Sequence, residues 1–164
     1  MKELMTEVVI HADTGVVWEI LTDVEEYLNW NPFVNKVTGK VKEGEDLEVL
    51  INLEEEIQTF FPTVTKVDYL HEIRLKRGFL IPGILTVEII TELHFLSKDS
   101  CILRQKCQVS GILSPIFWKK FAQPFKAGFE QMDQKLKKRA EALAIKNRAI
   151  NISRILGNGI AKVS

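Results

Sequence analysis

The sequence has no long hydrophobic run, no excess of charge of either sign, and only two cysteines. No stretch reaches the ~18 consecutive apolar residues of a membrane span, and Met1–Glu7 is charged where a secretory signal is apolar. Lys and Arg together number 22, as do Asp and Glu, so no overall field draws the chain to nucleic acid. We therefore expect a cytoplasmic protein with no nucleic-acid partner.

Motifs for catalysis, cofactors and metals are absent as well. The sequence contains no GxSxG elbow, phosphate-cradling loop or dinucleotide fingerprint. His11, His71 and His94 are expected on three separate strands and lack the spacing of a metal site. Cys101 and Cys107 are expected on one strand, on the order of 20 Å apart, which is too far for a disulfide. We expect no metal and no cofactor, and no residue is assigned a catalytic role.

The composition is that of one globular domain. A chain of 164 residues with 46% hydrophobic and 27% charged side chains can bury a core without disulfides. A first strand is predicted over Thr6–His11, after which Asp13 can cap a helix that carries Val17 and Leu21. Capping-box patterns at Thr22 and Asp23 predict a second short helix that ends before Pro32.

An antiparallel meander is predicted from Val34 to Gly111. Apolar and polar residues alternate over 47–54, which indicates a strand with one buried face, and its partner is expected before Gly44. Further strands are predicted over Ile57–Asp68, Leu70–Gly78, Ile84–Leu96 and Cys101–Gly111, giving about six or seven in all.

A long amphipathic helix is predicted to follow the meander. Ser114 can cap it and Pro115 suits its first turn. Apolar residues then recur at three- and four-residue steps as far as Leu143, whereas Pro124 is expected to kink or split the helix. This order of elements predicts an α+β helix-grip fold, a curved antiparallel sheet around a long C-terminal helix.

Several short motifs, in this order, resemble those of the START-like superfamily, also called the SRPBCC or polyketide cyclase/dehydrase-like group, which includes Bet v 1-like carriers. They are Ala12-Asp13 before Val17-Trp18, Trp30-Asn31-Pro32-Phe33, Ile81-Pro82-Gly83, His94-Phe95, Gly111-Ile112-Leu113, and the helical Gly128-Phe129 with Arg139-Ala140-Glu141. The resemblance implies a hydrophobic cavity between sheet and helix, which different members use for lipid binding, transport or cyclisation.

The aromatic residues suggest where such a cavity lies. We expect it to bind a small lipid-like or aromatic ligand through Trp30, Phe33, Phe61, Phe79, Phe95, Phe121, Phe125, Gly128, Phe129 and Met132, with Gly128 leaving a gap in the inner stripe. His94, Tyr69 and Glu88 are candidate polar groups of the cavity. They would serve the alternative function, a cyclase- or dehydratase-type enzyme.

The residues after the domain, 144–164, form a separate basic extension to a domain of residues 1–143. Ile145, Ala149, Ile152, Leu156, Ile160 and Val163 share one helical face, and no acidic residue follows Glu141. This pattern suggests weak contact with an anionic membrane or packing on the domain itself. A third alternative is an adaptor that binds another protein through the sheet edge or this tail, and the oligomeric state is open.

Overall fold

The fold was analysed in a computed structural model that describes residues 1–54, 56–79 and 81–160, with side chains described as far as residue 157. Lys162 and Val163 of the predicted tail helix, and the side chain of Ile160, therefore lie outside the described part. The elements are β1 (Lys2–Ile10), α1 (Thr14–Thr22), a 3-10 turn (Val24–Glu26), α2 (Tyr27–Trp30), β2 (Val34–Thr38), β3 (Glu48–Leu53), β4 (Glu56–Phe60), β5 (Thr63–Asp68), β6 (Glu72–Phe79), β7 (Leu85–Ser97), β8 (Ser100–Ser110) and α3 (Ser114–Ile160).

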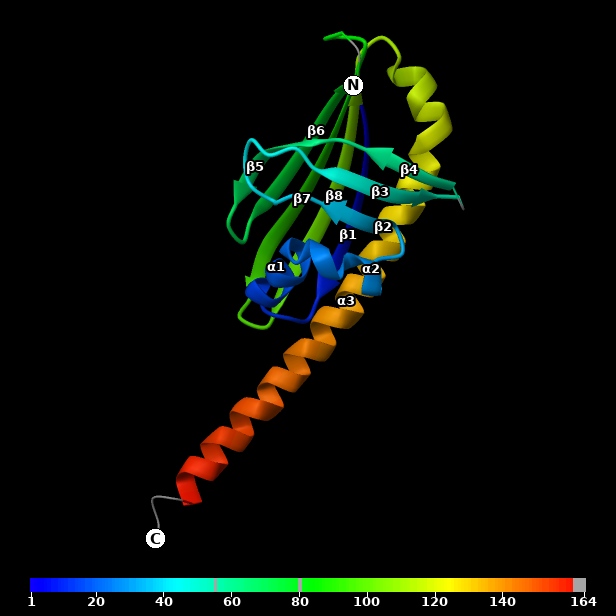
Figure 1. The fold of residues 1–164 in the computed structure, drawn as a ribbon. Helices are drawn as coiled ribbons and strands as arrows, with labels where there is room; N and C mark the ends of the chain where they lie inside the picture. Colours follow the sequence, from blue (N-terminus) through cyan, green and yellow to red (C-terminus); the bar gives the residue numbers. More distant parts are fainter. Residues whose placement is uncertain (55, 80, 161–164) are drawn as a thin grey trace.

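The eight strands form two antiparallel sheets on the α+β plan (Figure 1). One sheet has the order β1-β8-β7-β6-β5 and the other the order β2-β3-β4. The first strand closes the large sheet by pairing with the last, from Lys2 opposite Val109 to Ile10 opposite Cys101. The helix-grip prediction is confirmed, with two sheets in place of the single curved one.

The single strand predicted over Ile57–Asp68 is wrong, because the chain leaves one sheet and enters the other within it. β4 ends at Phe60 and β5 begins at Thr63. Pro62 lies between them and lacks the backbone N–H that a continuing ladder would require. This break accounts for one more strand than the sequence suggested.

The first strand is longer than predicted. It begins at Lys2, and its inward side chains include Leu4, Thr6 and Ile10, all buried. Thr6 is buried because its hydroxyl donates a hydrogen bond to Asp133 on α3. The buried side chains of β1 therefore extend the alternation N-terminal to the predicted start at Thr6, as far as Leu4.

The two short elements after β1 were predicted with mixed success. Asp13 caps α1, accepting a hydrogen bond from the Gly15 N–H at 2.8 Å. The capping boxes predicted at Thr22 and Asp23 do not form, because the 3-10 turn and α2 have no side-chain cap. Asn31 takes an extended conformation before Pro32, so α2 ends at Trp30 as the proline requires.

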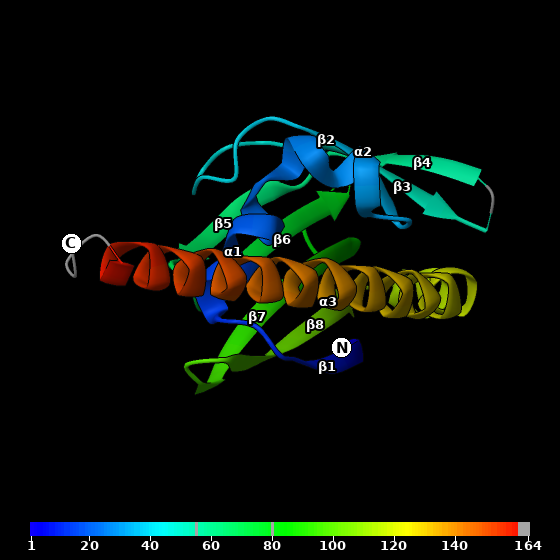
Figure 2. The same cartoon turned by 90° about the horizontal axis from the view of Figure 1, so that it is seen from below.

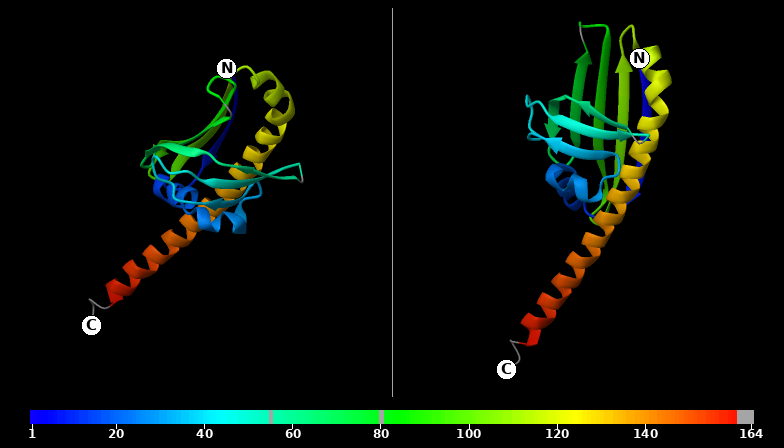
Figure 3. Two further views of the ribbon diagram at one scale, coloured as in Figure 1. Left: turned by 45° about the horizontal axis from the view of Figure 1, so that its top comes forward. Right: turned by 45° about the vertical axis from the view of Figure 1, so that its right-hand side comes forward.

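The long helix α3 begins at Ser114 and continues without a break to Ile160. Pro124 does not split it, although the first turns run at an angle to the rest (Figure 3). Its buried stripe contains Phe125, Phe129, Met132, Leu136, Ala140 and Ala144. Seen from below, the helix runs between the small sheet on one side and β1 and β8 on the other (Figure 2).

Beyond Ala144 the helix leaves the body of the molecule (Figure 1). Every side chain from Ile145 to Gly157 is exposed. Arg148 makes a final contact with the β7–β8 turn, where its Nη2 lies 3.3 Å from Asp99 Oδ1. No helix in the described part of the chain combines the length and apolarity needed to cross a membrane.

Candidate functional site

A cavity of about 140 Å³ lies between the two sheets, next to the inner stripe of α3. The sequence analysis predicted a cavity between a single sheet and the helix, whereas this cavity is lined by both sheets as well as by α3. β2, β3 and β4 form one wall, and β6, β7 and β8 form the opposite wall. The lining residues are Leu21, Val24, Tyr27, Phe33, Val34, Val37, Val41, Leu47, Val49, Ile51, Phe60, Pro62, Ile73, Leu75, Arg77, Val87, Ile89, Thr91, Gln105, Phe125, Phe129 and Met132.

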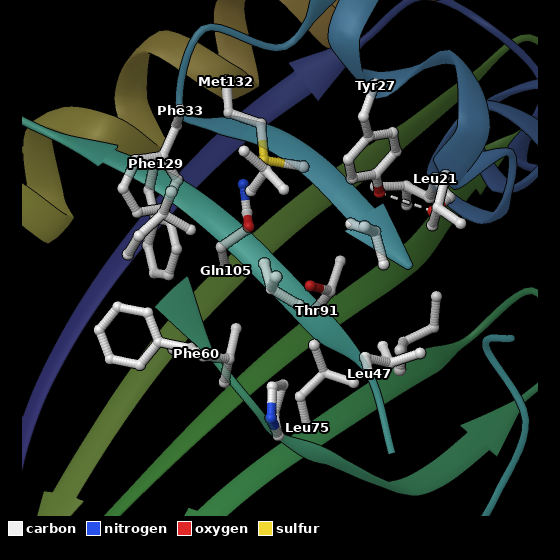
Figure 4. Close-up of a pocket in the computed structure, with 18 of the residues that line it drawn as sticks. Leu21, Tyr27, Phe33, Leu47, Phe60, Leu75, Thr91, Gln105, Phe129 and Met132 are labelled. Carbon is white, nitrogen blue, oxygen red and sulfur yellow. Dashed lines mark hydrogen bonds between the residues drawn. The ribbon is translucent and has the colours of Figure 1, made fainter. Parts of the chain in front are cut away.

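Aromatic rings from three parts of the chain form one end of the cavity (Figure 4). Phe33 stands before β2, Phe60 ends β4, and Phe125 and Phe129 project from successive turns of α3. Phe33 packs edge-on against Phe125 and Phe129, with ring centroids 5.7 and 5.6 Å apart, and Phe60 lies 6.1 Å from Phe125. These edge-to-face contacts hold the rings in fixed orientations.

Gln105 is the most buried polar residue of the cavity wall. It occupies an inward position of β8, and its Nε2 donates a 2.5 Å hydrogen bond to Asp133 Oδ1 behind it. Thr6 donates to the other carboxyl oxygen at 2.6 Å. Among the described residues, the side chain of Gln105 makes this one hydrogen bond, through its amide nitrogen, and none through its amide oxygen.

Asp133 is buried without a cationic partner in the described part of the chain. Burial raises the pKa of its carboxyl, the hydrogen bonds from Thr6 and Gln105 oppose the rise, and the charge of Glu130 adds to it. The carboxyl is not in the cavity lining. Its role in the site is to hold the Gln105 amide.

The other polar lining residues are Tyr27, Thr91 and Arg77. Burial and the nearby Asp23 raise the pKa of Tyr27, whose hydroxyl donates to the Leu21 carbonyl at 2.6 Å. Thr91 faces the cavity from β7 (Figure 4). Arg77 is the one charged residue in the described lining.

Four of the predicted ligand-binding residues line the cavity: Phe33, Phe125, Phe129 and Met132. Phe79 and Phe121 are half-buried against the core but do not line it, and Trp30 borders a separate surface hollow beside Arg139. Phe61 and Phe95 are exposed, at 48% and 68%. The gap expected at Gly128 is absent, because a Cβ there would overlap the ring of Phe33.

The three polar candidates do not meet in the cavity. Tyr69 is 70% exposed and lies edge-on to Trp18. Glu88 lies on the outer face of β7 opposite Arg74 Nη1 at 3.6 Å, and exposed His94 lies 3.2 Å from Glu92.

Contrary to the prediction, the three histidines do not all lie on strands: His11 follows β1 and His71 lies in the β5–β6 turn, so only His94 is on a strand. In the described residues, no group of three His, Cys, Asp or Glu side chains is placed to hold a metal.

The sequence analysis missed Tyr27, Arg77, Thr91 and Gln105. The two-residue alternation of the strands could have indicated two of them. Arg77 interrupts the inward series of Ile73, Leu75 and Phe79 on β6, and Gln105 interrupts the inward series of Leu103, Cys107 and Val109 on β8.

The two cysteines, Cys101 and Cys107, belong to the same buried series on β8, and burial raises the pKa of their thiols to about 11 and about 12. They remain protonated near neutral pH and are therefore weak nucleophiles.

Comparison with solved structures finds the same architecture in several proteins. A START superfamily protein from Mycobacterium smegmatis has a TM-score of 0.64 at 18% identity and covers 86% of this chain and 98% of its own. The ZhuI aromatase/cyclase from Streptomyces sp. R1128 has a TM-score of 0.67 at 17% identity, with 85% and 93% covered. The ginseng major latex-like protein 151 from Panax ginseng has 0.68 at 9% identity, with 85% and 97% covered.

These identities establish a shared fold and nothing finer. No family model matches the sequence. No curated protein has significant sequence similarity to it. The chemistry of the site must therefore be argued from the chain's own residues.

Proposed function

Because the chain has the helix-grip fold of START superfamily and Bet v 1-like proteins, we propose that it binds a small hydrophobic molecule in the cavity between its two sheets. The observation that carries the proposal is the lining, in which all side chains except those of Tyr27, Arg77, Thr91 and Gln105 are apolar. A dry apolar cavity of comparable size in another protein, about 150 Å³, holds benzene. The cavity therefore suits a ligand body of about one ring.

The affinity should be modest. Burial of about 250 Å² of apolar ligand surface at about 25 cal/mol per Å² gives about 6 kcal/mol before the costs of association. After those costs, a dissociation constant in the micromolar to millimolar range is expected for a purely apolar ligand.

Binding is favoured over proton-transfer catalysis by the nature of the four polar lining residues. Threonine and glutamine do not titrate, arginine stays charged, and the pKa of Tyr27 is raised. None of them exchanges a proton readily near neutral pH. His94, Tyr69 and Glu88, the groups on which an enzyme was predicted to depend, lie outside the cavity.

The test is a toluene titration followed by amide chemical shifts. We expect saturable shifts around the cavity, and weaker binding by Phe129→Trp, because the larger side chain fills the space at the aromatic end. Phe95→Trp is the matched control, since Phe95 is 68% exposed. Ile89→Phe is a second filling variant from the opposite wall, in case Phe129→Trp does not fold. Equal toluene affinity in wild type and a folded filling variant would refute the proposal.

The exposed end of α3 supports a second proposed activity, weak attachment to an anionic membrane. Ile145, Ala149, Ile152 and Leu156 share one face of the helix beyond the body. Lys146, Arg148 and Arg154 lie outside this stripe, and no acidic residue occurs in 142–164. A basic amphipathic helix of this kind lies in the interface of an anionic bilayer with its apolar face inward.

Vesicles of phosphatidylcholine with a quarter phosphatidylglycerol test this attachment. We expect binding at low ionic strength that falls with added salt, is lost when residues 144–164 are deleted, and is weakened by Ile152→Asp. Asn151→Asp is the matched control, because it adds the same charge to the adjacent residue but outside the apolar stripe. Equal binding by the Ile152→Asp and Asn151→Asp variants, or no binding by the intact chain, would exclude the membrane role. The adaptor alternative and the cytoplasmic location stay predictions from the sequence.

A further inference from the structure

Arg77 points in the opposite direction to the other charged residues of its strand. Along β6, Ile73, Leu75 and Arg77 line the cavity, whereas Glu72 and Arg74 form ion pairs on the outer face. The strand partner of Arg77 on β7 is Val87, another cavity residue. Arg77 is half-buried, so its guanidinium has lost part of its hydration, and a partly desolvated cation beside apolar residues is stabilised by a paired anion.

No described carboxylate pairs with Arg77. The arginines at 74, 104, 139 and 148 each lie within 4 Å of an acidic side chain, at Glu72, Glu7, Glu26 and Asp99 respectively. Arg154 also has no such partner among the described residues, but it is exposed on the tail, whereas Arg77 lines the cavity. The guanidinium of Arg77 instead lies over the ring of Phe79, 5.8 Å from its centroid. Stacking of this kind orients the guanidinium but leaves its N–H donors available.

We propose that Arg77 binds the carboxylate of the ligand, so that the molecule held in the cavity is a small apolar carboxylic acid. This inference rests on the proposed cavity function and specifies its ligand class. A guanidinium matches a carboxylate with two parallel N–H donors, which gives both affinity and orientation. The apolar body is limited by the cavity of about 140 Å³ to roughly one ring or a short chain.

The test compares one acid with its neutral amide, which has the same shape, and with a smaller, purely apolar molecule. Phenylacetate, phenylacetamide and toluene are titrated into wild type, Arg77→Gln and Arg77→Lys, with amide chemical shifts as the readout. In wild type we expect phenylacetate to bind at least about tenfold more tightly than phenylacetamide. Arg77→Gln should remove this preference and change toluene affinity less than about twofold, while Arg77→Lys should keep part of the preference through charge alone.

Arg74→Gln is the matched control, because Arg74 lies on the outer face of the same strand. Its acid preference should equal that of wild type, which separates a local pairing from a change in total charge. An acid preference that survives in folded Arg77→Gln, or that is absent from wild type while toluene still binds, overturns the Arg77 inference alone. Absence of saturable toluene binding in wild type would instead overturn the cavity function.

Discussion

The two faces of the five-stranded sheet are built from the same strands and have opposite chemistry. On β8, the inward residues Cys101, Leu103, Gln105, Cys107 and Val109 are all buried, whereas the residues between them are half-buried beside charged neighbours. The outer face carries a cross-strand network of ion pairs, including Lys106 with Glu92 at 2.8 Å and Arg104 with Glu7 at 2.7 Å. Beside the buried face, the carboxyl of Asp133 receives hydrogen bonds from two neutral donors, Thr6 and Gln105.

The two environments shift carboxyl pKa values in opposite directions. Desolvation raises the pKa of Asp133, and the neutral hydrogen bonds it receives do not reverse the rise. Desolvation also acts on Glu92, but the hydrogen bonds and charges of Lys106 and His94 outweigh it and lower the pKa. Asp133 is more deeply buried and has no cationic partner among the described residues, whereas Glu92 is half-buried beside Lys106, and both differences act in the direction of the shifts.

The largest effect is expected from loss of an aromatic ring that α3 contributes to the buried side of the sheet. Phe125→Ala should lower the free energy of unfolding by about 3 kcal/mol, because Phe125 packs against several rings and is 4% exposed. Phe95→Ala, at the exposed end of β7, should change it by less than about 0.5 kcal/mol. Urea denaturation measures both. Similar losses in the two variants would mean that the aromatic end of the cavity is not a packed part of the core.

A smaller effect is expected from Asp133→Asn, and it should depend on pH. Because the folded pKa of Asp133 is raised, its contribution to stability is complete below the unfolded pKa of about 4 and is lost as pH rises through the folded pKa. Asparagine does not ionise, so the stability of the Asp133→Asn variant does not fall in this way as pH rises. We expect a deficit of about 1–3 kcal/mol near pH 4, from the altered hydrogen bonds, that shrinks as pH rises. A deficit that grows with pH would contradict the raised pKa.

The smallest effect is expected from Glu92→Gln, with the opposite pH slope. The folded pKa of Glu92 is lowered, so its contribution is present above the unfolded pKa of about 4.3 and is lost as pH falls through the folded value. The variant should therefore be less stable than wild type by under about 1 kcal/mol at pH 7, and equal to it in acid. Thermal unfolding at several pH values measures the stability of both variants relative to wild type. If the stability differences of Asp133→Asn and Glu92→Gln changed with pH in the same direction, the two carboxyl groups would not have oppositely shifted pKa values.

The order of elements could be predicted from the sequence because local signals agreed with the final fold. The alternation around Leu47–Leu53 marked β3, the Asp13 cap marked α1, and Ser114-Pro115 marked the start of α3. The sequence also identified Phe125, Phe129 and Met132, because a helical stripe that covers a sheet faces inward along its length.

The remaining site residues could not be predicted from residue type alone. Phe95 and Phe61 were included as aromatics, but Phe95 lies near the end of β7 and Phe61 in the connection between β4 and β5, and both rings are exposed. Gln105 and Arg77 were not among the predicted polar groups of the cavity, although each occupies an inward strand position. Which wall each strand would form depended on the crossing from one sheet to the other at Pro62, and this is a property of the tertiary fold.

The position of Pro124 in α3 also decides which parts of the helix share an uninterrupted series of backbone hydrogen bonds. Pro124 has no backbone N–H, so one helical hydrogen bond is missing there, whereas the helix continues from Phe125 to Ile160 with no further proline. Phe129 in the cavity wall and Leu156 near the exposed end therefore belong to the same unbroken stretch of helix. A bend of α3 at Pro124 would move these two residues together.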